Sequence, residues 1–263
     1  MEDRRDYAVV TGGTSGIGYE LARLLADDGY NLVLVARDSG ELNRISQELM
    51  HEFRVDVIPL SKNLFNPENA FAVYDEVIAR KISPEVLIND AGQGHYGEFI
   101  NTNIQKELDI IQLNISSLVI LTKLFLRDMI KRRSGKILNL SSIASKIPGP
   151  WHSVYHGTKA FVQSFTEAVN SEVKDSGITV TALLPGATAT DFFNKADMLG
   201  AKIFHEGRLA SAAEVAKDGY EALKKGADMV VSGLRNKVQV VMSNITPDAM
   251  AADNMKKQQE PVE

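Results

Sequence analysis

The chain contains no cysteine among its 263 residues, which excludes disulfides, thiolate nucleophiles and cysteine-ligated zinc. Basic runs do not exceed Lys131-Arg132-Arg133, and the net charge is −5, whereas nucleic-acid binders usually carry a basic patch. No apolar run approaches the roughly 20 residues that span a bilayer, and residues 1–6 lack the apolar core of a signal peptide. We therefore expect a cytoplasmic protein that binds neither nucleic acid nor membrane.

The five histidines are scattered along the chain. They form no H-E-x-x-H motif and no close pair on one helix face, so the sequence predicts no metal site. His95, His152 and His205 fall in segments where we expect a substrate pocket, and we interpret each as a residue of the pocket wall or the surface.

The length suits one large α/β domain or two small ones. Apolar residues make up 44% of the chain and charged residues 24%, which is ordinary for a globular protein. No linker divides the sequence, so we expect a single domain over residues 1–250. Residues 251–263 are polar and end in Glu-Pro-Val-Glu, and we expect them to form a disordered tail.

Short apolar runs alternate with amphipathic helical patterns, which is typical of a parallel sheet covered by helices. The expected strands are 7–11, 31–36, 55–60, 86–89, 135–140, 178–184 and 228–233. The expected helices are the segment after Gly18, 41–53, 67–81, 103–132, 153–174 and 211–225. A polar residue, Asn114, interrupts the long pattern over 103–132.

The first strand runs into a glycine-rich turn and then into a helix. Such a turn makes an anion site, because free backbone N–H groups and the helix dipole point into it. Glycines also let a pyrophosphate approach the backbone. The candidate cofactor ligands here are Gly12, Thr14, Ser15, Gly16, Ile17 and Gly18. The alternative is a tight turn that holds no ligand.

Arg37 follows the second strand, at the place where an acidic residue would bind a ribose 2′-OH and an arginine would bind a 2′-phosphate. An arginine there favours NADP(H), with NAD(H) possible, and the alternative is a surface arginine at a strand end. Asp38 beside it could cap the next helix or contact the ribose.

Further candidates stand at the carboxyl ends of later strands, where ligands bind in open parallel sheets. Asn89 ends the fourth strand, and the small Ala91 and Gly92 after it would let a cofactor lie against the chain. Ser142 follows the fifth strand. The convergence of these residues with the glycine turn predicts one binding site at this edge of the sheet.

Tyr155 and Lys159 are four residues apart at the start of a helix, so both project from one helix face. With Ser142 thirteen residues ahead of Tyr155, and with the T-G-x-x-x-G-x-G pattern over residues 11–18, the chain resembles the classical short-chain dehydrogenase/reductase (SDR) family. The resemblance covers about residues 7–190.

The resemblance implies a single Rossmann-like, doubly wound α/β domain. Its mostly parallel seven-stranded sheet would have the order 3-2-1-4-5-6-7, with helices on both faces. It also implies a catalytic tetrad of Asn114, Ser142, Tyr155 and Lys159. Tyr155 would donate the proton, Ser142 would hold the substrate oxygen, and Lys159 would bind the nicotinamide ribose. Asn114 would hold a water, and the alternative for it is a satisfied core asparagine. We also expect the charge of Lys159 to lower the pKa of Tyr155.

The chain departs from the family's pattern at two positions, and the same resemblance adds further candidate residues. Asn63 stands where an aspartate commonly holds the adenine, next to Leu64, and Asp90 stands where asparagine is commoner. The turn after the sixth strand adds the cofactor ligands Pro185, Gly186, Thr188 and Thr190. Residues 191–210, rich in phenylalanine and methionine, correspond to a mobile substrate lid; the alternative is the ordinary packing of short helices.

These residues predict an NADP(H)-dependent oxidoreductase that interconverts a small carbonyl compound and an alcohol. The alternatives are an NAD-linked alcohol dehydrogenase of the same family and a non-catalytic NADP-binding regulator. In the family, the helices that match 103–132 and 153–174 pair across a two-fold axis, so we expect a homodimer or homotetramer. The apolar positions on which this rests are Leu118, Ile120, Leu121, Phe125, Phe161, Val162 and Phe165.

Overall fold

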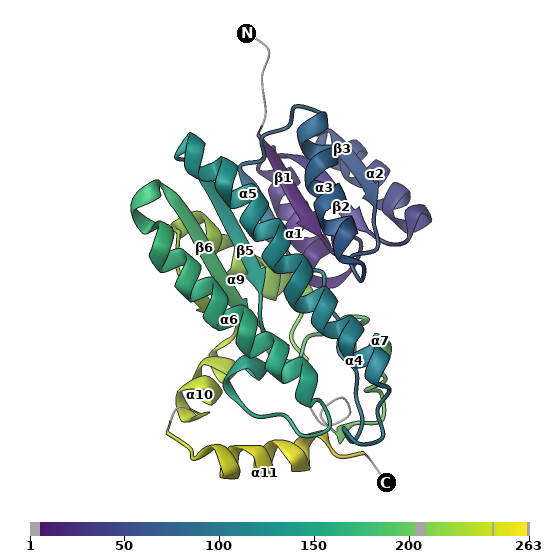
Figure 1. Ribbon diagram of the computed structural model, residues 1–263, viewed down its shortest axis with the longest axis vertical. Helices are drawn as coiled ribbons and strands as arrows, with labels where there is room; N and C mark the ends of the chain where they lie inside the picture. Colours follow the sequence, from purple (N-terminus) through teal and green to yellow (C-terminus); the bar gives the residue numbers. More distant parts are fainter. Residues whose placement is uncertain (1–5, 203–208, 244, 262–263) are drawn as a thin grey trace.

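A computed structural model describes residues 6–202, 209–243 and 245–261. Within these ranges seven strands form one parallel sheet in the order β3-β2-β1-β4-β5-β6-β7, so the predicted fold and strand order are confirmed. Figure 1 labels β1, β2, β3, β5 and β6 of this sheet. The strands are β1 (Tyr7–Thr11), β2 (Asn31–Ala36), β3 (Val57–Ser61), β4 (Val86–Asn89), β5 (Gly135–Leu140), β6 (Ile178–Leu184) and β7 (Met229–Val231).

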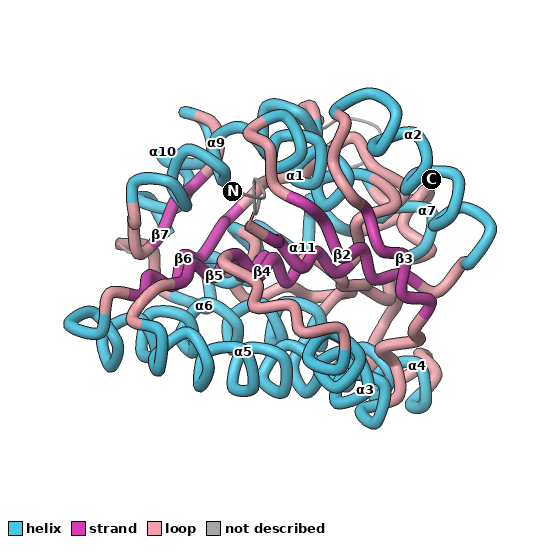
Figure 2. The backbone as a smooth tube through the Cα atoms, turned by 90° about the horizontal axis from the view of Figure 1, so that it is seen from above, coloured by secondary structure: helices cyan, strands magenta, loops and turns pink. Residues whose placement is uncertain are grey.

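The strands are apolar on both faces because helices cover both faces of the sheet (Figure 2). Side chains alternate along β2, so Leu34 enters the core beneath α1 whereas Val33 enters the core on the opposite face. The helices of the described chain are α1 (Gly16–Asp27), α2 (Ser39–Phe53), α3 (Pro67–Ala79), α4 (Ile104–Ile111), α5 (Leu118–Arg132), α6 (Ser153–Val173), α7 (Phe192–Lys195), α9 (Ala212–Lys225), α10 (Leu234–Ser243) and α11 (Asp248–Gln259).

Polar side chains cap the first turns of two helices, α2 and α9. Asp38 accepts a hydrogen bond from the backbone N–H of Glu41 at 3.0 Å and so caps α2. Ser211 caps α9 by accepting one from the N–H of Glu214. Of the two roles considered for Asp38, the structure therefore shows the helix cap.

The long helical stretch over 104–132 is interrupted where the sequence predicts. Residues Gln112–Ser117 form a π-helical segment between α4 and α5, and Asn114 lies in its middle. By length and composition the whole stretch Ile104–Arg132 could cross a membrane. In the structure its α5 portion packs on the sheet and buries Leu121, Phe125 and Met129, as a core helix does.

The expected disordered tail over 251–263 is wrong for the residues that the structure describes. Asp248–Gln259 forms α11, which crosses the end of the molecule toward which the strands point (Figure 1). Ala251 and Met255 are one helical turn apart and bury against Ile147, and this apolar contact holds the helix to the domain. In the predicted lid over 191–210, α7 forms at Phe192–Lys195, while residues 203–208, with His205, lie outside the described ranges.

Candidate active site

A cavity of about 1240 Å³ opens at the carboxyl edge of the sheet. The parallel register brings strand ends together there: Thr11 pairs with both Val35 and Asn89, and Asn89 pairs with Asn139. The cavity wall includes most of the candidate residues, namely Gly12, Thr14, Ser15, Gly16, Ile17, Arg37, Leu64, Ala91, Gly92, Ser142, Tyr155, Lys159, Pro185, Gly186, Thr188 and Thr190.

The glycine turn is shaped for a ligand that approaches the backbone closely. Gly12 and Gly16 have φ of 73° and 58°, in the left-handed region that favours glycine. A Cβ at Gly16 would lie 3.0 Å from the Thr190 side chain and narrow the cavity. Ser15 makes no side-chain cap to α1 within the described structure. The Gly18 N–H donates to the Asp90 carboxyl group, and the N–H groups of Gly16 and Ile17 before it receive no cap from Ser15, so the turn fits a pyrophosphate.

Thr11 joins the glycine turn to the segment after β4. Its hydroxyl donates to the carbonyl of Ile88 at 3.3 Å and accepts from the N–H groups of Asp90 and Ala91, both at 3.1 Å. One side chain thereby fixes the two neighbouring loops relative to each other.

At the other end of the cavity, Arg37 is exposed after β2. Its guanidinium lies 4.8 Å from the centroid of the Phe65 ring, and both side chains line the cavity. The aromatic ring holds the cation on one side. Phe65 is a cavity residue that the sequence did not single out, because a lone phenylalanine after a strand carries no distinguishing pattern.

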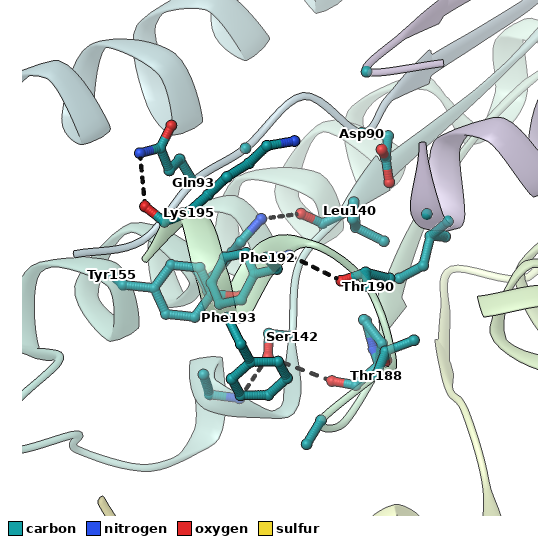
Figure 3. Close-up of a pocket in the computed structure, with 18 of the residues that line it drawn as sticks. Asp90, Gln93, Leu140, Ser142, Tyr155, Thr188, Thr190, Phe192, Phe193 and Lys195 are labelled. Atoms are coloured by element: carbon teal, nitrogen blue, oxygen red, sulfur yellow. Dashed lines mark hydrogen bonds between the residues drawn. The ribbon is translucent and has the colours of Figure 1, made fainter. Parts of the chain in front are cut away.

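Ser142 and Tyr155 lie on the same side of the cavity, next to Phe192 (Figure 3). The Ser142 hydroxyl accepts from the Ala144 N–H at 3.1 Å and donates to the Pro185 carbonyl at 3.3 Å, so it ties the β5 end to the turn after β6. The Tyr155 ring stacks on His152, with ring centroids 4.4 Å apart and an interplanar angle of 12°. Phe192 packs on Tyr155 with centroids 5.1 Å apart.

Lys159 lies one helical turn from Tyr155 and is buried. Its Nζ donates to the Leu140 carbonyl at 2.7 Å and lies 5.7 Å from the centroid of the Tyr155 ring. Burial lowers the pKa of Lys159 to about 8, and the negative charge of Asp90 acts in the opposite direction.

The expected lowering of the Tyr155 pKa by Lys159 is wrong for this structure. Burial raises the pKa of Tyr155 to about 12, the charge of Asp90 raises it further, and the hydrogen bond with Ser142 lowers it. Burial is the largest of these effects. Tyr155 consequently carries its proton at neutral pH, which suits a proton donor.

Four of the candidate residues lie outside the cavity wall. Gly18 packs against Asp90, and Asn63 is exposed and turns its side-chain oxygen to the Phe65 N–H. The side-chain amide of Asn89 points into the protein, where it donates to Thr122 and Asn139 at 3.0 and 2.8 Å.

Asn114 is the fourth candidate residue that lies outside the cavity wall. Its amide donates to the Gln93 carbonyl at 2.9 Å and to the Thr158 hydroxyl at 3.0 Å, while its oxygen accepts from the Gln93 N–H at 3.0 Å. It therefore fixes the loop beside Gly92. A Cβ on Gly92 would lie 3.4 Å from both the Asn114 Oδ1 and the Lys159 Nζ, so Gly92 adjoins both groups.

The sequence also missed the contribution of the C-terminal segment to this site. Met255, Lys257, Gln258 and Gln259 line the cavity. Gln259 donates from its amide to Nε2 of His156 at 3.1 Å, and Nδ1 of His156 lies 2.7 Å from the Ile147 carbonyl. His156 is thus a neutral ring that donates through Nδ1, in agreement with the burial that lowers its pKa. The backbone carbonyl of Gln259 also accepts from the Tyr96 hydroxyl.

Comparison with known proteins identifies a family and several relatives whose sequences are similar to this chain. The family model described as short chain dehydrogenase matches residues 6–198. A mouse protein, Dehydrogenase/reductase SDR family member 7B, is 30% identical over 253 residues, which are 93% of this chain and 78% of its own. The bovine Very-long-chain 3-oxoacyl-CoA reductase is 34% identical over 194 residues, or 70% of this chain. This match spans only 60% of the bovine protein's length.

Among solved structures, the short-chain dehydrogenase from Sphingobium yanoikuyae in complex with NADPH is similar to this chain. The two are 28% identical, with a TM-score of 0.81 over 92% of this chain and 96% of the other.

The contact between Gln259 and His156 should hold the C-terminal segment on the domain. Gln259→Ala leaves a buried imidazole nitrogen without its donor, which typically costs about 1–3 kcal/mol. We expect faster cleavage of the segment around α11 in limited proteolysis. Asn254→Ala, on an exposed position of the same helix, should leave the cleavage rate unchanged. Equal rates in both variants would show that this hydrogen bond does not secure the helix.

Proposed function

We propose an NADP(H)-dependent carbonyl reductase activity for this chain, which belongs to the short-chain dehydrogenase/reductase family. Membership of the family makes it an oxidoreductase that acts on CH–OH and C=O groups with NAD(P). The observation that carries the proposal is the convergence of the glycine turn, Arg37 and the Ser142–Tyr155–Lys159 group in one cavity.

The residues present fit a dinucleotide along the length of the cavity. The N–H groups at the start of α1 would bind the pyrophosphate, and the Arg37 guanidinium would bind a 2′-phosphate through charge-assisted hydrogen bonds. The solved NADPH complex of a similar protein supports this choice of cofactor. When bound, the nicotinamide supplies or accepts the hydride.

The protein side of the reaction follows from the positions of three side chains. During reduction, negative charge develops on the carbonyl oxygen, and the Ser142 and Tyr155 hydroxyls can both donate to it. Tyr155 then transfers its proton to that oxygen. Lys159 would bind the nicotinamide ribose, and the hydrogen bond with Ser142 favours the phenolate that remains. Asn114 acts by positioning the loop that carries Gly92.

The remainder of the cavity favours an apolar carbonyl compound. The cavity wall includes the apolar side chains of Ile147, Phe192, Phe193, Met198 and Met255 beside polar and charged residues. Burial of an apolar substrate body against these side chains would contribute roughly 25 cal/mol per Å² of contact. The name of the bovine relative, a very-long-chain 3-oxoacyl-CoA reductase, is compatible with a substrate of this kind.

Homodimer or homotetramer formation stays a prediction. The monomer itself buries several of the apolar positions on which the expectation rested, including Leu118, Leu121, Phe125 and Val162. Phe161 remains 41% exposed and stacks on Phe165. The exposed Phe161 ring on α6, stacked on the half-buried Phe165, supports self-association, which light scattering measures. Location in the cytoplasm likewise stays a prediction.

Arg37 should decide the choice between the two nicotinamide cofactors. Arg37→Asp removes the cation and supplies an acceptor for a 2′-OH, so NADPH should bind about 10–100-fold more weakly, given ~1.5–3 kcal/mol for a charged hydrogen bond. NADH should bind more tightly. Fluorescence titration measures both affinities.

Arg44→Asp makes the same charge change on α2, at an exposed residue outside the cavity wall, and should preserve the preference. If Arg37→Asp and Arg44→Asp shift the NADPH affinity equally, the 2′-phosphate does not bind at Arg37.

Tyr155→Phe tests the proton donor. The variant keeps the ring that stacks on His152 but removes the hydroxyl, so turnover should fall by ~10²–10⁴, the usual contribution of general acid catalysis. NADPH affinity should stay the same, because the glycine turn, Arg37 and Lys159 are retained. Steady-state kinetics and fluorescence titration separate these two effects.

Tyr74→Phe removes a tyrosine hydroxyl that donates to Asp128 between α3 and α5, outside the cavity wall, and should leave turnover unchanged. Turnover near the unmodified level in Tyr155→Phe would exclude this residue as the proton donor.

A further inference from the structure

Asp90 is a half-buried residue of the cavity wall whose carboxyl group packs against the glycine turn. Its backbone N–H is fixed by Thr11, and its side chain points to the start of α1 (Figure 3). A Cβ at Gly12 would lie 2.9 Å from the Asp90 Oδ2, and a Cβ at Gly18 would overlap the same oxygen. The carboxyl group therefore occupies the space that these glycines leave free.

The two oxygens of this carboxyl group differ in their hydrogen bonding. The backbone N–H of Gly18 donates to the carboxyl group. Oδ1 is fully buried and has no hydrogen-bond partner within the described ranges. An ionised carboxylate in such a place loses its hydration without full replacement, whereas a carboxylic acid loses much less.

Among the residues that the structure describes, the charged group that acts on Asp90 comes from α6. Residues 12–18 of the glycine turn contain no titratable side chain, and α6 contributes Lys159, which lowers the pKa of Asp90, and Tyr155, whose own pKa Asp90 raises. Neighbouring Leu140 at the end of β5 contributes only its carbonyl, which accepts from Lys159. Burial outweighs the attraction of Lys159 and raises the pKa of Asp90 to about 7.

We propose that Asp90 is a proton-binding residue of the cofactor site, and that the cofactor's diphosphate is held at the glycine turn with Asp90 in its neutral, protonated form. The proposal rests on the proposed function, since it requires the dinucleotide to bind at this turn. Asp90 packs on Gly12 and Gly18 of the same turn whose free N–H groups would receive the diphosphate. A carboxylate there repels that anion, and a carboxylic acid does not.

Binding of the cofactor and protonation of Asp90 are then linked. The anion stabilises the neutral form of Asp90, so the complex takes up a proton from solvent wherever the free protein is ionised. Below the pKa of about 7 in the free protein, Asp90 is already neutral and NADPH affinity is independent of this group. Above it, affinity should fall by up to about tenfold for each pH unit.

The test is calorimetric titration of the full chain with NADPH between about pH 6 and pH 9. Each titration is repeated in two buffers of different ionisation enthalpy, which gives the number of protons taken up on binding. Asp90→Asn keeps an acceptor for the Gly18 N–H and removes the titration. Asp38→Asn is the matched control, because it removes an exposed carboxylate from the Arg37 end of the same cavity wall. Lys159→Met removes the other buried titratable charge.

We expect proton uptake in the unmodified protein and in Asp38→Asn, and its loss in Asp90→Asn, whose affinity should exceed that of the unmodified protein at high pH. In Lys159→Met the uptake should persist at higher pH, because the cation that lowers the pKa of Asp90 is gone. Uptake that survives Asp90→Asn but disappears in Lys159→Met would place the proton on Lys159 and overturn the proposal.

NADPH binding without any proton uptake by the unmodified protein would also overturn the proposal, whether or not the variants fold, and would leave the proposed function intact. Absence of NADPH binding at every pH would overturn both.

Discussion

The hydrogen bonds of the Thr11 hydroxyl are the constraint on which the site depends. They join the end of β1 to the loop after β4, and so place the glycine turn beside Asp90, Ala91 and Gly92. The parallel sheet then brings Ser142 and α6 to the same edge, because the carboxyl ends of neighbouring strands coincide. A cavity between two fixed loops needs little rearrangement to bind an extended anion, and this lowers the cost of ordering the site.

Burial controls the chemistry of the titratable groups in this cavity. It raises the pKa of Tyr155 and of Asp90 and lowers that of Lys159. All three shifts favour the neutral forms, as expected for side chains that exchange water for protein. Tyr155 therefore holds a proton ready for transfer, whereas the pKa of Asp90 lies at about 7. The proposed proton uptake on cofactor binding follows from this shift of the Asp90 pKa.

Much of the fold and of the site could be predicted from the sequence because the signals are local. Strand periodicity, the glycine turn and the spacing of Tyr155 and Lys159 depend on neighbours along the chain. The functions of Asn89 and of α11 depend instead on distant partners. Asn89 ends a strand as a ligand would, but its amide bonds to Asn139 and Thr122. The polar α11 buries two apolar side chains, those of Ala251 and Met255. Two apolar residues in a polar sequence are too few to predict a packed helix in place of a disordered tail.

Transfer of the hydride itself tests the central claim most directly. NADPH carrying deuterium at the transferable C4 position would be incubated with the unmodified protein and a panel of apolar ketones and aldehydes, and the products analysed by mass spectrometry. The account predicts an alcohol with deuterium on its carbinol carbon, formed faster with NADPH than with NADH. Tight NADPH binding without oxidation of the cofactor by any compound of a broad panel would contradict it, and would indicate a regulator that binds the cofactor without catalysis.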